Sequence, residues 1–240
     1  MAADVAGVVW ALMGATIVVP GVYLLDLGLS QAYLWDRGDA LTLIDTGIAG
    51  SEQAILAALR SLGRSRVEVD DIVLTHYHDD HRGSAARLAN HTGATVVAHG
   101  ADEPVISGRE SQPPPNLTEE ERPFAERVMP LVPQARPVEV ARTVVDGDEL
   151  AGGAVVVHVP GHTPGSIAIF VPSLRVLFTG DTIASVEGAP ILGPFNLDRE
   201  LAKESVRKQA GLDFDVACFG HGAPIVGGAK ARIAEMAARL

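Results

Sequence analysis

The sequence predicts an α+β fold in which strands and helices are combined in both halves of the chain. Of its 240 residues, 47% are hydrophobic, which is enough to build a substantial core. Short apolar runs of strand length alternate with segments that have the apolar periodicity of helices. Several of the apolar runs end directly in histidine or aspartate. Because strand ends at one edge of a sheet converge on one crevice, these polar residues indicate a common site.

Charge and cysteine content exclude two classes of protein. A net charge of -11 without a cluster of Lys or Arg argues against nucleic acid as a partner, because such binding draws on basic side chains. The single cysteine, Cys218, excludes an internal disulfide framework and a cysteine-rich zinc module. Its place in an apolar run predicts a core residue.

The apolar segment 5–25 approaches the length of a membrane span. No Lys or Arg precedes Arg37, Pro20-Gly21 interrupts the run, and no small-residue cleavage site follows it. We therefore expect two buried strands, Thr16–Val19 and Val22–Leu25, in place of the alternative, a targeting segment. These features predict a cytoplasmic protein without a membrane partner.

The next segment, up to residue 98, predicts strands and two helices. Ser51 is a candidate N-cap for a helix that ends at Gly63, and residues 82–91 form the second helix. The expected strands are Ala32–Leu34, Leu41–Ile44, Val67–Leu74 and Ala94–Ala98.

A cluster of potential metal ligands, Thr75-His76-Tyr77-His78-Asp79-Asp80-His81, directly follows one of these strands. Imidazole and carboxylate groups bind zinc, iron and manganese. His76 and His78 are two residues apart, so in extended backbone they project to the same side and can share one metal. Asp80 and His81 follow the turn and can bind a second metal. The alternative is a polar surface loop, which leaves the concentration of ligands unexplained.

The segment 101–143 is rich in proline and differs in character from the rest of the chain. Thr118 opens a short amphipathic helix that carries Phe124, Val128 and Met129. We expect an insertion or lid that folds back on the body and shapes a substrate pocket, with a solvated linker as the alternative.

Strand patterns resume in the second half and again end in polar residues. Ala154–Val159 is followed by His162, Arg175–Phe178 by Asp181, and Asp215–Cys218 by His221. Each of the three polar residues alone is more typical of a turn than of a metal site, but together they indicate converging ligands. The remaining elements expected here are a strand at Ser166–Val171 and a C-terminal helix at Gly228–Leu240. The segment Ile183–Leu197 is expected to form part of the pocket wall, and Pro190–Phe195 within it is apolar and loop-like.

These motifs resemble the metallo-β-lactamase superfamily over most of the chain. The family pattern His-x-His-x-Asp-His matches residues 76–81, and Leu-Ile-Asp-Thr-Gly, Gly-His-Thr-Pro-Gly-Ser, Phe-Thr-Gly-Asp and Phe-Gly-His-Gly match further motifs in the family order. The resemblance implies a four-layer αββα sandwich of two mixed sheets with helices on both outer faces. It also implies one domain, 1–240, built from two similar halves, about 1–135 and 136–240.

The resemblance further implies a dinuclear metal site. His76, His78 and His162 would hold the first ion, Asp80, His81 and His221 the second, and Asp181 would bridge them. Zn²⁺ is expected, with Fe or Mn as alternatives, and a shared hydroxide would act as the nucleophile. Asp80 would also orient this nucleophile or pass a proton to the leaving group. Asp45 is expected to receive an N–H from a metal-bound histidine, with a simple turn carboxylate as the alternative.

The expected activity is hydrolysis of a small ester, thioester or lactone, as in the glyoxalase II-like and lactonase-like branches. True β-lactamases lack the bridging aspartate, so Asp181 argues against hydrolysis of antibiotics. Glutathione-thioester hydrolases carry a further helical segment after the last histidine ligand, whereas only a short segment follows His221, which argues against specificity for glutathione. Residues 182–184 lack the tyrosine of the lactonases. The partner expected is a small molecule with an uncharged or partly apolar acyl group, and the apolar loop is also a candidate homodimer contact. The alternatives are a mononuclear iron oxidoreductase like the persulfide dioxygenases, a phosphodiesterase, and a non-catalytic relative.

Overall fold

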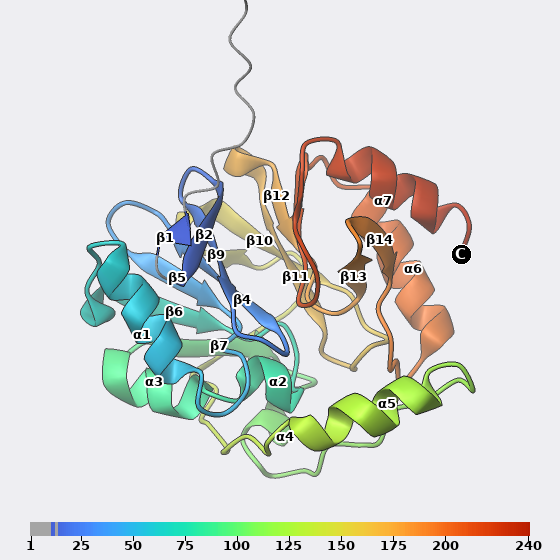
Figure 1. The fold of residues 1–240 in the computed structure, drawn as a ribbon, viewed down its shortest axis with the longest axis horizontal. Coiled ribbons are helices and arrows are strands. Elements are labelled where there is room, and N and C mark those ends of the chain that lie inside the picture. The colour runs from blue at the N-terminus through green and yellow to red at the C-terminus, as the bar shows by residue number, and fades with distance from the viewer. Residues whose placement is uncertain (1–10, 13) are drawn as a thin grey trace, which may run out of the picture.

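The computed structural model describes residues 11–12 and 14–240. The first ten residues, with the beginning of the apolar segment 5–25, lie outside the described part of the chain. Two large sheets lie face to face, with helices on both outer sides (Figure 1).

The first sheet has eight strands in the order of the sequence. The first five are antiparallel neighbours and the last four are parallel neighbours, which requires long crossover connections between the latter. The strands are β1 (Ala11–Leu12), β2 (Ala15–Val19), β3 (Val22–Asp26), β4 (Gln31–Asp36), β5 (Leu41–Ile44), β6 (Val69–Val73), β7 (Thr95–His99) and β8 (Arg142–Val144).

The second sheet has six strands in the order β16-β15-β12-β11-β10-β9, and β12 and β15 are its parallel pair. Their crossover contains a separate two-stranded hairpin. The sheet strands are β9 (Glu149–Leu150), β10 (Ala154–His158), β11 (Ile167–Val171), β12 (Val176–Phe178), β15 (Val216–Cys218) and β16 (Ile225–Val226), and the hairpin consists of β13 (Ile183–Val186) and β14 (Ala189–Leu192).

The helices divide between the two outer faces and the segment that joins β7 to β8 (Figure 1). On the first sheet lie α1 (Glu52–Ser61), α2 (Asp79–Arg82) and α3 (Ala85–Thr92), and on the second lie α6 (Arg199–Ala210) and α7 (Ala229–Ala237). The joining segment holds α4 (Glu103–Ile106) and α5 (Arg122–Val128).

Three apolar layers separate the four layers of secondary structure. Neighbouring residues of one strand enter different layers, because strand side chains alternate between the faces of a sheet. Leu43 packs toward α1 and α3, whereas Ile44 packs between the sheets. Ala168 of β11 packs toward α6 and α7. The predicted αββα sandwich is therefore confirmed.

Several local expectations differ from the structure. The expected helix 82–91 is two helices, α2 and α3, and a Cβ on Gly83 between them would overlap the backbone nitrogen of Ala49. Ser51 precedes α1 without a side-chain capping hydrogen bond. In β2, expected to be buried, the Ile17 side chain is 44% exposed because this strand lies near the edge of the sheet.

The largest differences lie in the second half. Residues 183–192 form the hairpin β13–β14, whose strands pair from Ile183 with Leu192 to Val186 with Ala189, so the beginning of the expected loop 190–195 is a strand. The chain changes sheets between Val144 and Glu149, later than the boundary near residue 135. The expected C-terminal helix is α7, whose buried Ile233 packs on the second sheet.

Candidate metal centre

The predicted ligands meet where the two sheets present strand ends to one another. Strands β5, β6 and β7 run in parallel and end at one edge of the first sheet. A backbone hydrogen bond of 2.8 Å from Ile167 to Thr75 joins this edge to the second sheet. Three overlapping groups of side chains each bring their ligand atoms within 4.8 Å of one another: His76, His78 and His162; His76, His81 and Asp181; Asp80, His81 and His221.

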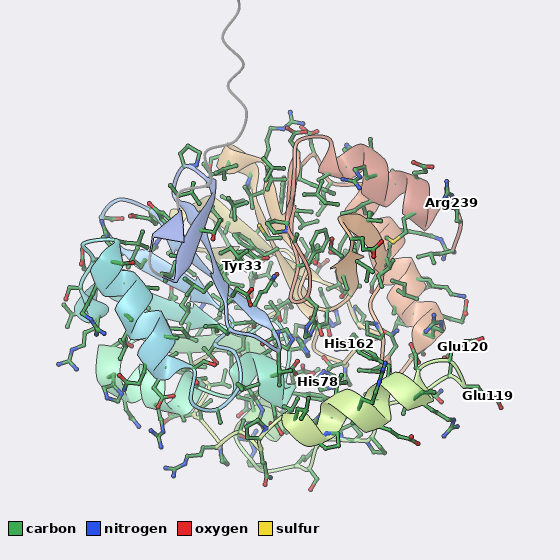
Figure 2. The ribbon with its side chains drawn as sticks, viewed as in Figure 1. Tyr33, His78, Glu119, Glu120, His162 and Arg239 are labelled. Carbon is green, nitrogen blue, oxygen red and sulfur yellow. The ribbon has the colours of Figure 1, made fainter. Side chains whose placement is uncertain are left out.

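Distances within these groups place Asp181 between the other ligands. Its Oδ2 lies 3.0 Å from Nε2 of His221 and 3.7 Å from Nε2 of His162. Its Oδ1 lies 3.3 Å from Nε2 of His81. On the other side, Nε2 of His162 lies 2.9 Å from Nδ1 of His78, and Figure 2 shows these two rings above α5. Asp181 thus lies close both to His162 at one end of the cluster and to His81 and His221 at the other.

The donor atoms fit metal ions. Nε2 of His76 is buried and has no hydrogen-bond partner among the described residues, although it points into the cluster. A buried polar atom without a partner is costly unless something else satisfies it. A Cβ on Gly220 would overlap Oδ1 of Asp181, so the glycine before His221 lets the chain approach the cluster. Imidazole nitrogens with carboxylate oxygens are a donor set for Zn²⁺, Fe or Mn.

Electrostatics divide the histidines into two kinds. Burial, with the neighbouring histidines, holds the pKa of His76 well below its usual range, and burial with His162 lowers the pKa of His78 to about 3. Both rings are therefore neutral, the form that binds metals. Burial lowers the pKa of His221 too, but the carboxylates of Asp181 and Asp80 outweigh it and raise this pKa to about 10. The carboxylates thus hold a positive charge at this end of the cluster.

Asp45 follows β5 and lies behind the ligands. Its Oδ2 lies 2.9 Å from Nδ1 of His81 and accepts the hydroxyl of Thr75 at 2.7 Å. Its Oδ1 accepts the Thr75 N–H at 2.8 Å. The Asp45 backbone has a φ of 58°, in the left-handed region that is uncommon outside glycine. This arrangement orients the His81 ring with Nε2 toward Asp80, Asp181 and His221.

Asp102, a side chain absent from the sequence prediction, joins the loops that carry the three-histidine group. Its Oδ2 accepts the Tyr77 N–H at 3.0 Å and the Thr163 hydroxyl at 2.7 Å, and its Oδ1 accepts the Gly165 N–H at 2.6 Å. Tyr77 lies between His76 and His78, and Thr163 follows His162. Burial raises the pKa of Asp102 to about 6. The sequence offered one indication of this role, which is that Asp102 follows a strand closely. An aspartate in that position is equally typical of a helix N-cap.

A cavity of about 340 Å³ opens beside the ligands. Its walls come from the proline-rich segment 101–143 and from the hairpin with the loop that follows it. The predicted ligands that line it are His78, Asp80, His162, Asp181 and His221. The cavity therefore gives a small molecule access to the cluster. Among the helices of the described residues, none has the length and apolar character needed to cross a membrane.

Known proteins similar to this chain identify its family. The family described as metallo-beta-lactamase superfamily matches residues 25–221, a range that includes all seven predicted ligands. The probable metallo-hydrolase YflN of Bacillus subtilis is 29% identical over 248 residues, which cover 95% of this chain and 90% of that protein. A hydroxyacylglutathione hydrolase of Rhodospirillum rubrum is 30% identical over 149 residues, covering 61% of this chain and 44% of that enzyme.

A solved structure shows the same fold. A metallo-beta-lactamase family protein from Thermus thermophilus has a TM-score of 0.69 at 23% sequence identity, covering 93% of this chain and 80% of that chain. The family match, the αββα sandwich and the clustered histidine and aspartate side chains all agree with the resemblance seen in the sequence. This protein belongs to the metallo-beta-lactamase superfamily.

Proposed function

We propose that this protein is a hydrolase that uses two divalent metal ions, most suitably Zn²⁺, to cleave a small ester, thioester or lactone. The observation that carries the proposal is the convergence of seven donor side chains into overlapping groups at the end of a cavity. An open cavity beside the ligands is typical of a catalytic metal site, whereas structural zinc sites are closed and rich in cysteine.

The ligands divide into two sets around Asp181. His76, His78 and His162 would hold the first ion, and Asp80, His81 and His221 the second, with Asp181 contributing to both. Bound there, the ions would lower the pKa of a shared water toward about 7 and polarise the scissile carbonyl. Asp45 holds Nδ1 of His81 and so directs the opposite ring nitrogen into the cluster.

Asp80 is the candidate acid–base residue. It lines the cavity, so it can touch substrate, and its Oδ2 lies 3.3 Å from Nε2 of His221. Burial raises the pKa of its carboxyl, but His81 and His221 outweigh burial and lower it to about 2. The carboxylate is therefore ionised at neutral pH, the form that can bind a metal ion and accept a hydrogen bond from the attacking water, which would orient that water.

The chemistry of the cavity favours an acyl substrate over a phosphodiester. Among the described residues that line it, there is no lysine or arginine to pair with a phosphate. The relatives support hydrolysis in general, and one of them is named for an acylglutathione substrate.

The test combines metal analysis with a substrate panel. Two metals per chain are expected, together with hydrolysis of p-nitrophenyl esters, aryl thioesters or lactones by the metal-loaded enzyme. Asp181→Asn should lower the content to about one metal and abolish hydrolysis, because a bridging carboxylate becomes a neutral amide. Asp39→Asn, at an exposed aspartate far from the ligands in sequence, is the matched control. A single iron per chain, or activity on phosphodiesters alone, would overturn the proposal in favour of an alternative.

A further inference from the structure

The cavity beside the metal centre is apolar over most of its wall. Helix α5 and the residues after it contribute Phe124, Val128 and Met129, and the hairpin with its following loop contributes Ile191, Pro194 and Phe195. None of these six side chains belongs to the groups of potential metal ligands described above. They form a separate surface that contacts whatever part of a substrate extends away from the reacting bond.

The few polar groups of this wall offer no partner for a negatively charged substrate. Apart from the predicted ligands, the polar side chains that line the cavity are Asp79, Gln112 and Ser185. Asp79 pairs with Arg82 at 2.8 Å, and Arg82 does not line the cavity. Away from the predicted ligands, a carboxylate against this wall would lose its hydration without gaining a cationic partner from the described side chains that line it. The wall therefore suits an uncharged group.

Two phenyl rings join the lid to the body across this wall. Phe124 of α5 stacks on Phe195, with ring centroids 5.4 Å apart and planes 26° from parallel. Phe195 has a φ of 63°, a backbone conformation that is rare for a bulky residue and persists only where the surroundings impose it. The Phe195 N–H donates to Oε1 of Glu121 at 3.4 Å, which ties this strained residue to the lid.

The position of Phe195 is also set relative to the metal ligands. Two residues further on, the N–H of Leu197 donates to the carbonyl of His162 at 3.3 Å. The next N–H, from Asp198, donates to the carbonyl of Gly161 at 2.8 Å. The loop that carries Phe195 is therefore attached to the loop that carries a ligand. Such an attachment keeps the ring at a constant distance from the reacting centre.

We propose that this chamber binds an uncharged aliphatic or aromatic group of the substrate, and that Phe124 and Phe195 select for that group. The inference rests on the proposed hydrolase function and narrows its substrate to neutral apolar esters, thioesters or lactones. A volume of about 340 Å³ is at the lower end of the range for ligand pockets, so the group is small to medium in size.

The first arm of the test compares esters with one leaving group. The zinc-loaded full chain is assayed with p-nitrophenyl acetate, butyrate and hexanoate, and with mono-p-nitrophenyl glutarate. The value of kcat/KM should rise from acetate to hexanoate by roughly fourfold for each methylene that becomes buried. The glutarate ester, which ends in a carboxylate, should react at least tenfold more slowly than the hexanoate ester. Equal rates for acetate and hexanoate, or a preference for glutarate, would overturn the inference.

The second arm uses variants of the wall. Phe124→Ala and Phe195→Ala should each lower the ratio of hexanoate to acetate kcat/KM about tenfold. Phe124 is 43% exposed, so its replacement should not prevent folding. Phe124→Ala therefore still provides a test if Phe195→Ala does not fold. Leu131→Ala, on the same lid but 60% exposed and outside the wall, is the matched control and should keep the wild-type ratio. An unchanged ratio in both phenylalanine variants counts against the inference.

The third arm separates the inference from the proposed function. The ketones 2-octanone and 2-butanone resemble the esters but cannot be hydrolysed, and their binding is measured by calorimetry. The wild-type protein should bind 2-octanone at least tenfold more tightly than 2-butanone, and Phe124→Ala should remove most of the difference. Selective ketone binding without any ester hydrolysis would reject the proposed function alone. Ester hydrolysis without selective ketone binding would reject the apolar chamber alone.

Discussion

Asp102 is a residue whose two carboxylate oxygens have separate tasks. One oxygen accepts hydrogen bonds from Tyr77 and Thr163, and the other accepts the N–H of Gly165. An asparagine of the same shape has only one acceptor oxygen, so its NH₂ group must face one of these donors. In one orientation the Gly165 N–H loses its acceptor and in the other the Tyr77 N–H does, so either orientation weakens the connection between the two loops that carry the three-histidine group.

Replacement of Asp102 by Asn should therefore weaken metal binding at the three-histidine group by about tenfold to a hundredfold, the usual effect of losing a group that supports metal ligands. Competition with a chromophoric chelator measures the zinc affinities of the wild-type protein and the variant. The absorption spectrum of the cobalt-substituted proteins reports the ligand geometry. The Asp39→Asn variant serves again as the control. Unchanged affinities and an unchanged cobalt spectrum, even with lower thermal stability, would show that Asp102 stabilises the fold without positioning ligands.

The sequence could place the candidate ligands but not Asp102, for a physical reason. Each candidate ligand lies in the short segment after an apolar run, so the local pattern alone places it near a strand end. The task of Asp102 depends on Thr163, which is 61 residues away in the chain and meets it only through packing of the two sheets. No local pattern contains that contact.

At the scale of elements, those with a clear local sequence pattern could be predicted, and those that depend on packing were missed. Strands such as β11 and β12 are continuous apolar runs and could be located from sequence. Helix α6 was missed, because its sequence Arg-Glu-Leu-Ala-Lys-Glu-Ser-Val-Arg-Lys-Gln-Ala is mostly charged and polar and its apolar face is narrow. The side chain of Asp198 caps this helix by accepting the Leu201 N–H. In β13–β14, Gly188 and Pro190 resemble a loop, yet the segment forms a hairpin whose buried Ile183 and Leu192 pack in the same apolar layer as α6 and α7.

Glu121 is the link between the lid and this wall. Its Oε1 accepts from the Arg199 guanidinium at 2.9 Å as well as from Phe195, and its Oε2 accepts the Thr118 N–H at 3.0 Å. Burial raises the pKa of Glu121, but these donors outweigh burial and lower it, so the ionised carboxylate is the form that holds the lid.

Replacement of Glu121 by Gln should loosen the lid, because the charge that attracts Arg199 is lost. Amide hydrogen exchange in residues 118–132 should become at least severalfold faster, while exchange in β11 stays unchanged. Glu126→Gln removes an exposed carboxylate of the same helix and should leave the exchange rates as in the wild type. Equal effects of the two substitutions would mean that general charge, and not the Glu121 contacts, holds the lid.

At the scale of the whole molecule, one hydroxyl connects the two sheets close to the site. Tyr33 of β4 donates its O–H to the carbonyl of Phe219 at 2.9 Å and accepts the N–H of the same residue at 3.1 Å. The Tyr33 ring also packs edge-on against Phe178 of the second sheet, with centroids 5.3 Å apart. His221 lies two residues beyond Phe219, so this contact anchors the last ligand loop.

Removal of the hydroxyl by Tyr33→Phe should lower the free energy of unfolding by about 1–3 kcal/mol, since a buried N–H and C=O lose their partner. Urea unfolding of the metal-free protein measures this loss. Tyr23→Phe, in the neighbouring strand β3, removes a half-buried tyrosine hydroxyl that has no hydrogen bond within the described structure and should change stability by less than about 0.5 kcal/mol. If Tyr23→Phe lowers the free energy of unfolding as much as Tyr33→Phe does, the effect comes from removing a tyrosine hydroxyl in general and not from the hydrogen bonds between Tyr33 and Phe219.

The composition of the three ligand groups has a consequence for assembly. Each group takes two side chains from the first sheet and one from the second: His162, Asp181 and His221 are the second-sheet members. Neither half of the chain is therefore a complete chelator, and high-affinity capture of an ion has to wait until the sheets have docked. Ions bound as proposed would link the two sheets to one another at this site. The metal content of a preparation would then report the fraction of molecules in which both halves have come together.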